Sequence, residues 1–142
     1  MRSLCSLAAA IFVNSLCACS PPPAQLGPDG SLTLALPRRP AVNEMLMVNL
    51  TVGRVSANTK IVIRTADGEI AGTIAPFGVK PGQKAGIYSI AVPAKAIADA
   101  KVTLKLELVD KQGQAVRAPT KAEIEDAKLA FSPVSVQGKE KK

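Results

Sequence analysis

The sequence contains no histidine and no tryptophan, and aromatic residues make up only 3% of its 142 positions. Without histidine the chain lacks the commonest general base and the commonest metal ligand, and Ser-His and Cys-His nucleophile pairs are excluded. With so few aromatic rings, any core must be built from Val, Ile, Leu and Ala. The length suits one domain, and 47% hydrophobic with 20% charged residues is the composition of a folded chain.

Cysteine is confined to the start of the chain, at Cys5, Cys17 and Cys19. Within residues 1–20, Arg2 is followed by an apolar run over residues 4–13 and then by small residues. This order is that of a signal peptide, and the run is shorter than the roughly 20 apolar residues of a transmembrane helix. No later stretch approaches that length, so we expect no other membrane span.

The four residues Leu16-Cys17-Ala18-Cys19 resemble the lipobox of bacterial lipoproteins, in which the cysteine becomes the new N-terminus. The resemblance implies that residues 1–18 are removed and that acyl chains on Cys19 hold the protein in a membrane. In that family Ser20 is compatible with sorting to the outer membrane, where the protein faces the periplasm. An ordinary secretory signal with a chance cysteine, or a retained anchor, is the alternative.

Residues 19–30 are then a lipidated cysteine and a proline-rich tether. Pro21-Pro22-Pro23 favours polyproline II, in which ten residues extend roughly 30 Å. A leader without function is the alternative interpretation. Either way, we expect the folded domain over residues 31–136 and a basic tail over residues 137–142.

From residue 31 onward, short apolar alternations separated by turn residues predict β-strands. The clearest is 101–108, where Val, Leu, Leu and Leu alternate with Lys, Thr, Lys and Glu, as one buried and one wet face require. Asp67-Gly68 between two apolar runs predicts a hairpin. The Ala-rich segment 94–100 and the capping-box sequence Thr120-Lys121-Ala122-Glu123 predict short helical turns at most.

Seven or eight such strands without a long helix between them predict an all-β fold, a single antiparallel β-sandwich. The pattern resembles immunoglobulin-like or fibronectin-type envelope modules, with short helical turns in the connections. A small open or closed β-barrel is the alternative.

Two groups of side chains offer metal-ligand atoms. The acidic residues of 123–126 supply oxygens for a hard cation, and Met45 with Met47 supplies sulfur for Cu(I). The first lacks a ligand loop and the second lacks histidine partners. We therefore interpret them as a solvated edge and as core, and we expect no catalytic residue, no cofactor, no metal and no enzyme activity.

Positive charge is the one skew in composition, with 18 Lys and Arg against 11 Asp and Glu and a net charge of +7. The local concentrations are Arg38, Arg39, Lys139, Lys141 and Lys142. Nucleic acid is a poor partner for an exported protein, so anionic lipids or envelope polymers are the expected ligand class. The alternative is that lysines only keep sheet edges from aggregating.

Two functions remain open. The first is a structural or protein-interaction module, lipid-anchored in the envelope, whose sheet edge accepts a strand from a protein partner. The second is a binding module for an anionic envelope polymer or lipid. High salt should weaken the second and leave the first nearly unchanged.

Overall fold

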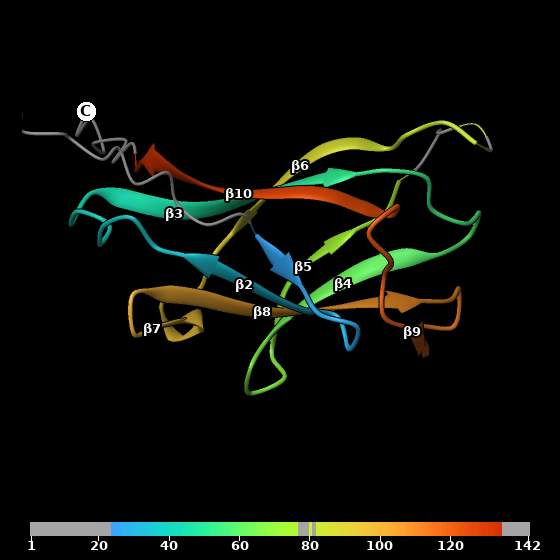
Figure 1. Ribbon diagram of the computed structural model, residues 1–142, viewed down its shortest axis with the longest axis horizontal. Helices are drawn as coiled ribbons and strands as arrows, with labels where there is room; N and C mark the ends of the chain where they lie inside the picture. Colours follow the sequence, from blue (N-terminus) through green and yellow to red (C-terminus); the bar gives the residue numbers. More distant parts are fainter. Residues whose placement is uncertain (1–23, 77–79, 81, 135–142) are drawn as a thin grey trace, which may run out of the picture.

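The computed structural model describes residues 24–76, 80 and 82–134, which form two facing antiparallel sheets (Figure 1). Along this part of the chain the elements are β1 (Gln25–Leu26), β2 (Ser31–Ala35), β3 (Glu44–Val52), β4 (Lys60–Thr65), β5 (Ile70–Ile74), β6 (Gly86–Ala91), the 3-10 turn η1 (Ala94–Ala96), β7 (Ile97–Ala98), β8 (Lys101–Val109), β9 (Ala115–Arg117) and β10 (Ile124–Pro133). The larger sheet has the order β1-β2-β8-β4-β5, with β7 and β9 also paired to β8, and the smaller has the order β10-β3-β6. The predicted all-β, sandwich-like character is confirmed, and the closed barrel is wrong because the two sheets do not join.

Strand β8 is the centre of the larger sheet, because it pairs with β2 along one edge and with β4 along the other. Its Val102, Leu104, Leu106 and Leu108 are buried, whereas the alternate lysines and Thr103 are exposed. The predicted period of two is thus confirmed. Each such aliphatic side chain contributes about 1.5–3 kcal/mol when fully buried.

The buried core consists of aliphatic side chains and alanine, as the scarcity of aromatic residues predicted. The smaller sheet contributes Val48, Leu50 and Val52 from β3, and the larger contributes Ile61 and Ile63 from β4, all of them at 0% exposure. Tyr88 and Phe131 are partly buried at the margin of this cluster. In the described part of the chain, the fully buried side chains between the two sheets are therefore aliphatic.

The folded domain begins before residue 31, within the segment that we interpreted as a tether. Strand β1 pairs antiparallel with β2, and Ala24 and Leu26 pack against the core. The turn between them needs Gly30, which has φ 82° and whose absent Cβ would lie 2.2 Å from the carbonyl oxygen of Leu106. Turn residues on both sides of a two-residue strand gave this segment the composition of a linker.

The methionines of β3 are not core residues, so that interpretation was wrong. Met45 is 41% exposed and Met47 is intermediate, because the buried face of the strand consists of Leu46, Val48, Leu50 and Val52. Apolar residues occupy both faces at the start of β3. Their pattern therefore did not reveal which face turns inward.

The local turn predictions are confirmed in part. The Asp67-Gly68 hairpin joins β4 and β5, with the Gly68 N–H donating to the Thr65 carbonyl at 2.9 Å. The segment 94–100 forms η1 and then the short strand β7. Residues 121–123 form a turn without a helix, because β10 begins at Ile124.

Replacing Leu104 with Asp is expected to unfold the domain, because a buried unpaired charge costs several kcal/mol, a large part of a small domain's stability. Lys105→Glu on the opposite face of β8 is the matched control and is expected to cost less than about 1 kcal/mol. Circular dichroism and thermal unfolding of both variants measure the difference. Equal melting temperatures would show that the two faces of β8 are misassigned.

Candidate functional site

The structure describes two of the predicted contact residues, Arg38 and Arg39. Cys19, Lys139, Lys141 and Lys142 lie outside the described residues. Both arginines belong to the connection between β2 and β3, residues 36–43. This connection, the turn between β7 and β8, and the last residues of β10 lie at one end of the sandwich, on the left of Figure 1. We call this region the arginine end.

An open groove of about 650 Å³ lies at the arginine end, between residues 36–40 and residues of η1, β7 and the following turn. Asp99 and Ala100 in that turn have φ of 49° and 54°. Positive φ at both positions is typical of a two-residue type I′ hairpin loop, and it costs roughly 1–2 kcal/mol for alanine. The Ala100 carbonyl accepts a hydrogen bond from the Leu36 N–H at 2.8 Å, which ties the turn to the end of β2.

Arg38 is occupied by internal partners. Its guanidinium donates to both carboxylate oxygens of Glu44, at 2.6 and 2.9 Å, and lies 3.8 Å from the centre of the Phe131 ring. These hydrogen bonds from Arg38, with one from the Ala41 N–H, lower the pKa of Glu44 to about 2. Arg38 is therefore a neutralised, structural cation, which its sequence position beside Arg39 did not indicate.

Arg39 is exposed, and within the described part of the chain it forms no ion pair. Exposed apolar side chains belong to the same end of the sandwich: Val42 at 108%, Met45 at 41% and Val134 at 43% exposure. The Val134 N–H donates to the Asn43 carbonyl at 2.8 Å, so the end of β10 lies beside the start of β3. The arginine end thus combines an available cation with apolar side chains in water.

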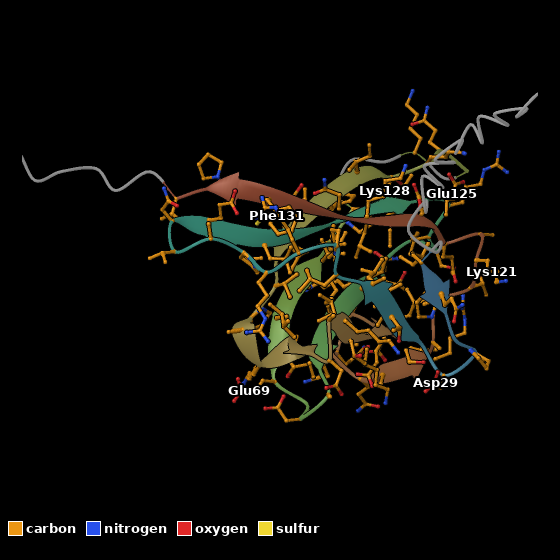
Figure 2. All side chains as sticks on the ribbon, turned by 60° about the vertical axis from the view of Figure 1, so that its left-hand side comes forward. Asp29, Glu69, Lys121, Glu125, Lys128 and Phe131 are labelled. Atoms are coloured by element: carbon orange, nitrogen blue, oxygen red, sulfur yellow. The ribbon has the colours of Figure 1, made fainter. Side chains whose placement is uncertain are left out.

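The acidic residues of 123–126 do not converge on a cation. Glu123 is only 6% exposed, and its carboxylate accepts hydrogen bonds from the Arg117 guanidinium at 2.6 and 2.8 Å and from Thr120. Glu125 pairs with Lys84 and Asp126 pairs with Lys128, each at 2.8 Å. Glu125 and Lys128 both belong to β10 (Figure 2).

The interpretation of these acids as a solvated edge is therefore wrong for Glu123. The Thr120-to-Glu123 spacing did carry a real signal, since the carboxylate accepts the Thr120 N–H as in a capping box. That interaction closes a tight turn where we expected a short helical one. In the described ranges, no group of three or more acidic or cysteine side chains is arranged to hold a metal ion.

Strand β6 presents one edge that no described strand covers. In an antiparallel ladder, alternate residues of a strand bond to its neighbour. The Val92 N–H donates to the Leu46 carbonyl at 2.8 Å, which assigns the even-numbered residues to the β3 side. The N–H groups of Ile87, Ser89 and Ala91 therefore point to the uncovered edge.

The opposite edge of this sheet, on β10, is protected against further pairing. It has a register shift between Ile124 and Asp126, an Ala127 N–H already bonded to the Asp126 carboxylate at 2.9 Å, the charge of Lys128, and Pro133. These are the devices by which sheets avoid edge-to-edge association. β6 has no charged residue, no proline and no register shift, and its Ile87 is 71% exposed.

Comparison of the chain with known protein families, with curated proteins and with solved structures finds no match. The part of the chain seen in the structure forms no helix with the length and apolarity needed to cross a bilayer. Function must be inferred from the arginine end, from the uncovered edge of β6 and from the residues before the first strand.

The Glu123 carboxylate is expected to make stability pH-dependent. Hydrogen bonds from Arg117 and Thr120 hold its pKa below the ordinary 4.5 in the folded protein. Its contribution is thus present above about pH 4.5 and is lost as pH falls through the lowered pKa. Glu123→Gln should cost about 1–3 kcal/mol at neutral pH and should show a smaller loss on acidification than wild type.

Urea unfolding at neutral and acidic pH measures both effects. The control is Glu125→Gln, which removes an exposed pair and should change stability by less than about 1 kcal/mol. Parallel pH profiles for wild type and Glu123→Gln would contradict the assignment of this group.

Proposed function

We propose that the protein is a non-enzymatic, lipid-anchored protein of the bacterial cell envelope, and that its β-domain is a structural or protein-interaction module. The anchor is supported by Leu16-Cys17-Ala18-Cys19 after an apolar run, and by the absence of cysteine after residue 19. In this proposal Cys19 carries the acyl chains, and the domain faces the periplasm from the outer membrane. We also propose that the β-domain has an immunoglobulin-like topology.

The observation that carries the interaction module is the uncharged, uncovered edge of β6. An extended segment of a protein partner can add to this edge, with its carbonyls accepting the N–H groups of Ile87, Ser89 and Ala91. Each such bond contributes about 0.5–1.5 kcal/mol. The exposed Ile87 side chain adds an apolar contact beside the new strand. Backbone bonding of this kind recognises a protein and gives no means of reading nucleic acid.

Contact with an anionic polymer or lipid is the second candidate, and Arg39 is the observation that favours it. Arg38 contributes little net charge to such a contact, because Glu44 neutralises it at 2.6 Å. An ionic contact should weaken steeply as salt rises, whereas strand addition to β6 should change little. A salt titration of whichever complex is isolated therefore separates the two.

Replacing Cys19 with Ala is expected to block processing and release the protein from membranes, because no thiol remains at the acylation site. Cys17→Ala is the matched control: it keeps a small residue at that position and should be processed as wild type. Membrane fractionation and intact mass measure the outcome. A soluble wild-type chain without acyl mass would contradict the anchor.

Ala91→Pro is expected to remove one donor from the uncovered edge of β6 without breaking the ladder to β3, since proline is tolerated where the N–H would face outward. Ala91→Val at the same position keeps the donor and is the control. Crosslinking in intact cells should capture the same partner with wild type and Ala91→Val, and at least tenfold less with Ala91→Pro. Equal capture by both variants, with unchanged melting temperatures, would exclude strand addition at this edge.

A further inference from the structure

We propose that the arginine end of the domain rests on the anionic lipid surface of the membrane that holds Cys19. This inference rests on the proposed function, because it requires the acyl anchor. It goes further by assigning the face of the domain that meets the membrane and the side chains that contact it. Those side chains are Arg39, Val42, Met45 and Val134.

The direction of the chain at the first strand points the anchor toward this end. Strand β1 is antiparallel to β2, with Gln25 opposite Thr33, and β2 runs toward the arginine end. From Ala24 through β1 the chain therefore runs away from the arginine end. Four residues lie between Cys19 and Ala24, and the five steps from one to the other extend at most roughly 18 Å.

The domain itself extends at least as far in the same direction. Ala24 and Ala127 line one opening of about 240 Å³ between β1 and β10. From Ala127, strand β10 continues for six residues to Pro133, which is roughly 20 Å of extended chain. A connection of roughly 18 Å from Ala24 toward the arginine end is shorter than the roughly 20 Å of β10 that extends the same way. With such a connection, the domain lies in contact with the bilayer. The separation of roughly 30 Å that a tether of ten residues would allow is not available, because β1 includes part of that segment.

The chemistry of the arginine end suits a lipid surface better than it suits water. Val42 is fully exposed, and Met45 and Val134 are exposed by about two-fifths. Among the residues that the structure describes, Arg39 forms no ion pair and Glu44 is paired with Arg38. Asp99 of the β7–β8 turn is the other acid that lines the groove with Arg39, and it is exposed. Apolar side chains that enter the headgroup region, beside a cation that meets anionic lipid, are the two components of interfacial binding.

One turn at the far end of the sandwich lacks this combination and supplies an internal control, although Arg54 and Ile87 are also exposed at that end. The turn after β8, residues 110–114, consists of Asp, Lys, Gln, Gly and Gln and has no apolar side chain. It lies at the opposite end of β8 from the β7–β8 turn. A probe at Gln112 therefore reports the distance of the far end from the membrane, and a probe at Asn43 reports that of the arginine end.

The test uses the full-length lipidated protein with Cys5 and Cys17 replaced by Ala, reconstituted into vesicles. Asn43→Cys and Gln112→Cys each carry one fluorophore, and headgroup spin-labelled lipid quenches it at short range. In vesicles of phosphatidylglycerol and phosphatidylethanolamine we expect quenching severalfold stronger at Asn43 than at Gln112. Arg39→Gln and Val42→Ser should each reduce quenching at Asn43 and leave Gln112 unchanged.

Failure of the anchor and failure of the docked face give different results. A purified chain that lacks acyl mass and does not float with vesicles overturns the proposed function. A chain that floats, but is quenched equally at Asn43 and Gln112, overturns the docked face and leaves the anchor standing. Energy transfer between Asn43 probes on different copies, without lipid quenching, shows that a second copy covers this end and also overturns it. If the stronger quenching at Asn43 is lost in phosphatidylcholine vesicles, the contribution of Arg39 is supported. If quenching at Asn43 is undiminished there, the contribution of Arg39 is overturned.

Discussion

Burial of one aliphatic face of β8 is the constraint on which the rest of the structure depends. Strands β2, β4, β7 and β9 all pair with β8, so the larger sheet exists only where that strand is held in place. It is held by Val102, Leu104 and Leu106, whose side chains belong to the same buried cluster as those of β3. Because none of the fully buried side chains in the described residues is aromatic, this cluster depends on many aliphatic side chains, each of which makes many weak atomic contacts. The positions of both sheet edges and of both ends of the sandwich follow from it.

Sequence reasoning succeeded where the determinants are local. The alternation in β8 and the Asp67-Gly68 hairpin depend on neighbouring residues, and both are present. It failed for Met45, because β3 begins with apolar residues on both faces and only the opposing sheet decides which is buried. Strand β1 was missed because two residues give no period.

The candidate surfaces depend on contacts between distant parts of the chain, and the sequence carries little trace of them. Arg38 and Arg39 are adjacent and chemically identical, yet Phe131 and Glu44 occupy the first and leave the second exposed. The uncovered edge of β6 exists because of the order in which strands assemble. The protective features of β10 were visible as Lys128 and Pro133, but their meaning depends on its edge position. The fold thus decides which charged side chains are paired, and most of the described acids are. It also places the uncovered edge of β6 and the exposed Arg39 in different parts of the molecule.

If a partner strand adds to the uncovered edge of β6, as we propose, that edge ties the amount of this protein to the amount of its partner. Copies made in excess keep Ile87, Ser89 and Ala91 open, and the edges of two such copies can pair with each other as readily as with a partner. Surplus molecules would then be open to self-association and to proteolysis, whereas molecules with an occupied edge would be protected. Under this proposal, synthesis balanced with that of the partner, rather than the stability of the isolated domain, would set the abundance of the protein.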